Sequence, residues 1–142
     1  MKIFCVRVGT RYGKQYEDYI NSKLDNVIWL HEQIHPHILG QWNKLHGMTF
    51  DQDEPLLVLD IDILLMNDYM ELINYPVKRG QFLSIQAWWG QSIDCSYKLQ
   101  GGFQKYYPKD CLYIYEKFMK DPKYWQQHYI KNGTTEGPIN GE

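Results

Sequence analysis

Apolar residues along the chain form short continuous runs that alternate with stretches in which they recur every three or four positions. The continuous runs are rich in Val, Ile, Leu and Phe, which is typical of β-strands that pack in a core. They predict strands over residues 3–8, 27–30, 56–59 and 82–85. The run at 56–59 is wholly apolar, so we expect both faces of this strand to be covered.

Helical spacing of apolar positions predicts the elements between and after these strands. The expected helices cover residues 13–24, 41–45, 68–73, 110–119 and 125–130. Asp68 and Asp110 stand at the starts of two of them, where a carboxylate can cap the first backbone N–H groups. Asp121-Pro122 separates the last two helices, because proline fits a first helical turn.

This order of strands and helices predicts an α/β fold, with a mostly parallel central sheet flanked by helices. Ligands of such sheets bind beyond the carboxyl ends of the strands. Three segments follow strands at that edge, namely residues 9–12, 60–62 and 86–89. We therefore expect a ligand site formed by these segments.

Length and composition place the chain among ordinary globular proteins. Its 142 residues suffice for one domain with a hydrophobic core, and 44% of them are hydrophobic and 23% charged. The net charge of −2 and the lack of a basic cluster predict that nucleic acid is not a partner. The 12 Tyr, 5 Trp and 5 Phe fit either core packing or stacking on sugars and bases.

The 3 cysteines are widely spaced, which argues against both a disulfide framework and a zinc site. Cys5 and Cys111 stand in apolar patterns and are expected to be buried thiols. No apolar run approaches the roughly 20 residues that span a bilayer, so we expect no membrane span. These features predict a cytoplasmic protein.

The most informative feature for chemistry is Asp60-Ile61-Asp62, which directly follows an apolar strand. Residues two apart in an extended segment project to the same side, so both carboxylates can converge on one ion. Hard divalent cations such as Mn²⁺ or Mg²⁺ take oxygen ligands and bridge to substrate phosphates. The alternative is a solvated turn whose carboxylates cap the following residues.

The segment from Leu56 to Leu65 resembles the Asp-X-Asp segment of GT-A glycosyltransferases, and further pieces follow in the expected order. Residues 6–12 resemble the first strand and nucleoside loop, and residues 42–45 the short helix before the Asp-X-Asp strand. Gln100-Gly101-Gly102-Phe103 resembles a turn after the next strand, and residues 137–142 an acidic loop. The likeness is greatest to chlorella-virus glycosyltransferases that build capsid glycans, and it covers nearly the whole chain.

The resemblance implies an enzyme that moves a hexosyl or deoxyhexosyl group from a UDP-sugar donor to a hydroxyl of a glycan or glycoprotein acceptor, with inversion. In a virus this would serve capsid glycosylation in the host cytoplasm. Asp60 and Asp62 would hold Mn²⁺ or Mg²⁺. The donor would contact residues of the three edge segments and of the short helix: Gly9, Thr10, Arg11, Tyr12, Lys44, Asp60, Ile61, Gly101 and Gly102.

The resemblance also implies an acceptor wall at Trp88 and Trp89 and a general base at Glu142 or Asp94. Each of these residues has an alternative role in the core or as a solvated side chain. Members of the family continue further and supply another metal ligand, commonly a His, for which no histidine here stands at the matching place. We therefore expect residues 1–142 to be a single GT-A domain truncated at its C-terminal end.

Two other functions remain open from the sequence. A haloacid-dehalogenase-type phosphatase also places Asp-X-Asp after an apolar strand and would use Asp60 as its nucleophile. In that class the motif follows the first strand and is itself followed by a small polar pair. This chain has Ile63-Leu64 at the place of that pair. A non-catalytic carbohydrate-binding module would fit the aromatic content but is usually all-β.

Overall fold

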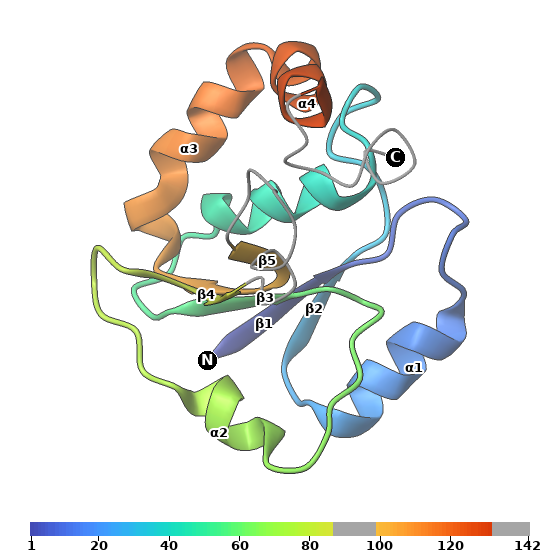
Figure 1. The fold of residues 1–142 in the computed structure, drawn as a ribbon, viewed down its shortest axis with the longest axis vertical. Helices are drawn as coiled ribbons and strands as arrows, with labels where there is room; N and C mark the ends of the chain where they lie inside the picture. Colours follow the sequence, from blue (N-terminus) through green and yellow to red (C-terminus); the bar gives the residue numbers. More distant parts are fainter. Residues whose placement is uncertain (87–98, 132–142) are drawn as a thin grey trace.

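The computed structural model describes residues 1–86 and 99–131, which form one sheet covered by helices (Figure 1). The strands are β1 (Lys2–Val6), β2 (Val27–Leu30), β3 (Leu56–Leu59), β4 (Phe82–Gln86) and β5 (Leu99–Tyr106). The helices are α1 (Lys14–Lys23), the 3₁₀ helix η1 (Gly40–Thr49), α2 (Tyr69–Asn74), α3 (Pro108–Lys120) and α4 (Pro122–Lys131). The α/β class predicted from the sequence is confirmed.

The sheet has the strand order β2-β1-β3-β5-β4. β1 is parallel to both β2 and β3, whereas β5 is antiparallel to both β3 and β4. Four strands therefore run in one direction and β5 runs against them, so the sheet is mixed. The prediction missed β5, because Gly101-Gly102 in its middle interrupts the apolar pattern by which strands are recognised.

Alternate residues of the central strands supply two separate cores. On one face, Ile3, Leu57 and Phe103 pack with residues of α1 and α2. On the other face, Phe4 and Val58 pack with residues of η1 and α3. Figure 1 shows α1 and α2 on one side of the sheet and η1 and α3 on the other. β3 is buried along its whole length, as its apolar run predicted.

Several element boundaries differ from the predictions in ways that have local causes. The short helix expected at 41–45 is a ten-residue 3₁₀ helix. Asp68 precedes α2 but has φ 62° and makes no capping bond, so the predicted cap is wrong. Asp110 lies inside the first turn of α3, which begins at Pro108, and its carboxylate accepts the Gly80 N–H instead. Asp121 caps α4 by accepting the Tyr124 N–H at 3.0 Å.

Two further sequence expectations concern the thiols and the membrane. Cys5 and Cys111 are buried and unpaired, as predicted, whereas Cys95 lies outside the described residues. Within residues 1–86 and 99–131, no helix has the length and apolar character required to cross a bilayer.

Candidate functional site

The candidate site lies at the carboxyl edge of the sheet, between β1 and β3. The chain leaves β1 toward β2 on one side and leaves β3 toward β4 on the other, so the strand order reverses at this point. In open α/β sheets, loops diverge at such a reversal and leave a crevice for ligands. The loop after β1 carries Tyr12, and the segment after β3 carries Asp60 and Asp62.

Asp60 is tied to two neighbouring elements. Its carboxylate Oδ1 accepts a hydrogen bond from Lys44 Nζ of η1 at 2.6 Å, and Lys44 also donates to the Gly101 carbonyl oxygen of β5 at 2.9 Å. The Lys44 side chain is 12% exposed and that of Asp60 is 36% exposed. The pair is therefore a partly sheltered ion pair that opens to solvent on the carboxylate side.

Asp62 is tied to the loop after β1. Tyr12 Oη donates to Asp62 Oδ2 at 2.6 Å, which joins segments fifty positions apart. Partial burial of the phenol, together with the hydrogen bond to Asp62 and its charge, raises the pKa of Tyr12 to about 12. The Arg11 guanidinium carbon lies 5.3 Å from the centre of the Tyr12 ring. The phenol therefore remains protonated and holds the carboxylate in place near neutral pH.

Gly101 and Gly102 lie within β5, not in the turn that the sequence resemblance predicted. Ser84 pairs with Gln104 and the next residue of β4 pairs with Gln100, so residues 101–103 form a bulge. The Asp60 N–H donates to the Gly102 carbonyl oxygen at 2.9 Å. A Cβ on Gly102 would lie 3.0 Å from Asp60 Oδ2, so the absence of a side chain lets the carboxylate approach the strand.

The donor set of this site fits a hard divalent cation that a substrate helps to hold. Asp60 and Asp62 supply two carboxylates, and Mg²⁺-type sites commonly combine one or two carboxylates with substrate phosphates and water. Among the described residues, no cluster of three or more His, Cys, Asp or Glu side chains gathers anywhere. The remaining ligands would therefore come from the substrate, from water or from outside the described ranges.

The other predicted site residues lie in an exposed loop, in the core or outside the described residues. Gly9, with φ +74°, and Thr10 lie exposed in the loop after β1. The Ile61 side chain is 5% exposed and belongs to the core, so only its backbone remains for a ligand. The predicted acceptor and base residues all lie outside the described ranges: Trp88, Trp89, Asp94 and Glu142.

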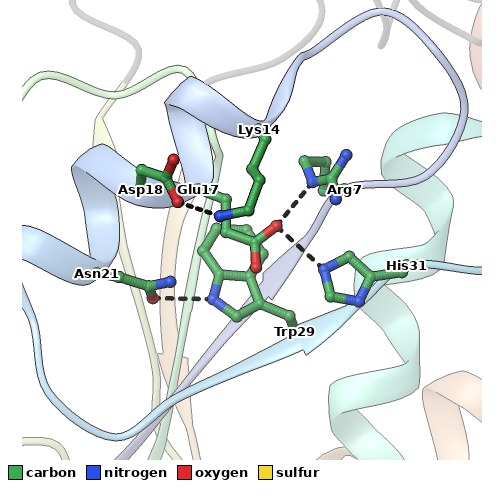
Figure 2. Close-up of polar contacts among 7 residues, drawn as sticks. All are labelled: Arg7, Lys14, Glu17, Asp18, Asn21, Trp29 and His31. Carbon is green, nitrogen blue, oxygen red and sulfur yellow. Dashed lines mark hydrogen bonds and ion pairs between the residues drawn. The ribbon is translucent and has the colours of Figure 1, made fainter.

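Sequence reasoning missed a second polar cluster at the same edge of the sheet (Figure 2). Glu17 of α1 accepts from Arg7 Nε at 2.8 Å and lies 3.1 Å from His31 Nε2. Burial opposes ionisation of Glu17, but the bonds to Arg7 and His31 outweigh it and lower its pKa. Arg7 directly follows β1 and His31 directly follows β2, which is the sequence signal that they meet. His31 also stacks on Trp29 at an interplanar angle of 10°.

Comparisons of the chain with models of protein families, with curated proteins and with solved structures found no match.

Proposed function

We propose that the chain binds the diphosphate of a nucleotide-sugar donor through a divalent cation at Asp60 and Asp62. The activity would be transfer of a sugar from a UDP-sugar to a hydroxyl of a glycan or glycoprotein acceptor. One observation carries the proposal. The Asp60 carboxylate, a sheltered lysine and a glycine bulge meet where the strand order reverses, and Tyr12 of the loop after β1 holds the Asp62 carboxylate two residues further on.

Each side chain has a role that follows from its place. Lys44 is bonded to Asp60 and Arg11 lies against the ring of Tyr12, so both cations are suited to diphosphate oxygens. Tyr12 orients Asp62 through its hydrogen bond and presents an aromatic ring for the base. Gly102 lets the Asp60 carboxylate lie close against β5. A bound Mn²⁺ or Mg²⁺ would neutralise charge on the departing diphosphate as a Lewis acid.

Acceptor binding and proton transfer are assigned only from the family resemblance. They involve Trp88 and Trp89 as the acceptor wall, and Asp94 or Glu142 as the base of an inverting transfer. A role in capsid glycosylation by a virus likewise rests on the family resemblance.

The geometry favours this function over the two alternatives. A phosphatase that uses Asp60 as its nucleophile would place it after the first strand, whereas it follows β3 and is bonded to Lys44. A carbohydrate-binding module of the usual all-β architecture would lack α1 and α3, which cover the two faces of this sheet.

Calorimetric titration of UDP into the protein, with and without Mn²⁺, tests the proposal. We expect binding that requires Mn²⁺ and that falls at least about tenfold in Asp62→Ala, since loss of a ligand to the ion is large in binding terms. The matched control is Asp51→Ala, an exposed carboxylate that precedes β3 at the opposite edge. Unchanged UDP affinity in Asp62→Ala would remove the metal assignment. Hydrolysis of p-nitrophenyl phosphate that Asp60→Asn abolishes would favour the phosphatase.

A further inference from the structure

We propose that Lys44 is the resident counter-cation of Asp60, which it releases to the divalent cation only when a nucleotide diphosphate binds. This inference rests on the proposed function and adds to it how cation binding depends on nucleotide binding. The protein would bind the divalent cation weakly alone, and cation and nucleotide would bind cooperatively.

The contacts of Lys44 show how it holds the carboxylate. Its Nζ lies 2.6 Å from Asp60 Oδ1 and 2.9 Å from the Gly101 carbonyl oxygen. The 12% exposure of the side chain means that its charge is only partly screened by water. The ammonium has three donors, and these two bonds are the ones it makes to residues 1–86 and 99–131. These described partners therefore occupy two of the three N–H groups and leave the third for an incoming anion.

Charge explains why the divalent cation would be weakly held without nucleotide. Lys44 balances Asp60, so the carboxylate pair carries one net negative charge instead of two. A divalent ion bound to Asp60 would also stand close to the ammonium, and like charges at such range repel strongly when sheltered from water. Asp62, which already accepts from Tyr12, supplies the remaining attraction.

A diphosphate reverses both effects. Its several charged oxygens give the ammonium acceptors besides the carboxylate, and a lysine on its flexible stem can turn to them. Asp60 is then left for the cation, while the phosphates add further ligands for it. Because coupling is reciprocal, UDP must raise the affinity for Mn²⁺ by the same factor as Mn²⁺ raises that for UDP.

Mn²⁺ binding to wild type and to Lys44→Met, followed by the electron paramagnetic resonance of free Mn²⁺, tests this rule. Without nucleotide, we expect Lys44→Met to bind Mn²⁺ about tenfold more tightly than wild type. With Mn²⁺ present, we expect it to bind UDP about tenfold more weakly. The Mn²⁺ affinity should rise while the UDP affinity falls. A general loss of structure would instead weaken the binding of both ligands.

Two further variants serve as controls. Lys44→Arg keeps the charge and should retain weak Mn²⁺ binding in the absence of UDP. Lys109→Met removes an exposed lysine that pairs with Asp51 and Asp53, and should change neither affinity. If Lys44→Met does not fold, Lys44→Gln, which keeps a donor for Gly101, should show the same signs.

The outcomes are distinguishable. If wild type binds UDP with Mn²⁺ but Lys44→Met binds Mn²⁺ alone no more tightly, the counter-cation role is wrong and the donor site stands. If wild type binds UDP under neither condition, the proposed function fails and this inference fails with it.

Discussion

Asp60 owes its position to a lysine and to a glycine that lie far from it in the sequence. Lys44 fixes one carboxylate oxygen, and Gly102 leaves space beside the other. The sequence predicted Asp60 and Asp62 from their spacing after an apolar strand. It could not predict the Lys44–Asp60 and Tyr12–Asp62 bonds, because they depend on how separate elements are placed in space.

The two glycines of the β5 bulge allow a test of single-residue changes. In Gly102→Ala, the added Cβ would lie 3.0 Å from both Asp60 Oδ2 and Gln100 Nε2, so the carboxylate must move. We expect the affinity for UDP with Mn²⁺ to fall about fivefold to tenfold, as measured by calorimetry, because a misplaced ligand binds an ion poorly.

Gly101→Ala is the matched control for that change. Its Cβ would have Lys44 Nζ at 3.8 Å as its nearest neighbour, an ordinary contact. We expect its UDP affinity to stay near that of wild type. Equal losses in the two variants would mean that the bulge backbone matters and not the space beside Asp60.

At the scale of elements, helix α1 is fastened to the ends of β1 and β2 through Glu17 (Figure 2). The Glu17 side chain is 13% exposed and receives bonds from Arg7 and His31. Since Arg7 opens the loop that leads to Tyr12, this cluster supports one wall of the candidate site. No helical or strand pattern in the sequence links these three residues.

The lowered pKa of Glu17 predicts a pH-dependent loss of stability in Glu17→Gln. A carboxyl group whose pKa is lower in the folded state stabilises it above the ordinary carboxyl pKa. This contribution is lost as pH falls through the lowered value. We expect Glu17→Gln to reduce the free energy of unfolding by about 1–3 kcal/mol at pH 7. The difference from wild type should begin to shrink only at the ordinary carboxyl pKa and should vanish below the lowered pKa of Glu17.

Urea unfolding at a series of pH values measures this difference. Asp18→Asn on the same helix is the control, because Asp18 is 59% exposed and pairs only with the solvated Lys14 among the described residues. A difference for Glu17→Gln that stays the same at pH values well below the ordinary carboxyl pKa would contradict the charge-based explanation.

For the whole sheet, sequence patterns predicted most but not all of the elements. Four strands and all the helices were predicted to within a few residues, because continuous apolar runs and helical spacing identify buried elements. β5 was not, since its glycine pair carries no side chains to form a pattern. The mixed direction of the sheet follows from that strand, so it too was out of reach. Asp60 and Asp62 follow the carboxyl end of β3, as the order of apolar and acidic residues predicted.

We propose that the edge between β1 and β3 binds a nucleotide diphosphate with a divalent cation. The most direct test is the nuclear magnetic resonance spectrum of ¹⁵N-labelled protein with UDP and traces of paramagnetic Mn²⁺. We expect selective broadening of amide signals from residues 9–12, 60–62 and 101–102, and its loss in Asp62→Ala. Broadening that needs no UDP and centres on Asp51 and Asp53, or no broadening, would rule out this binding site.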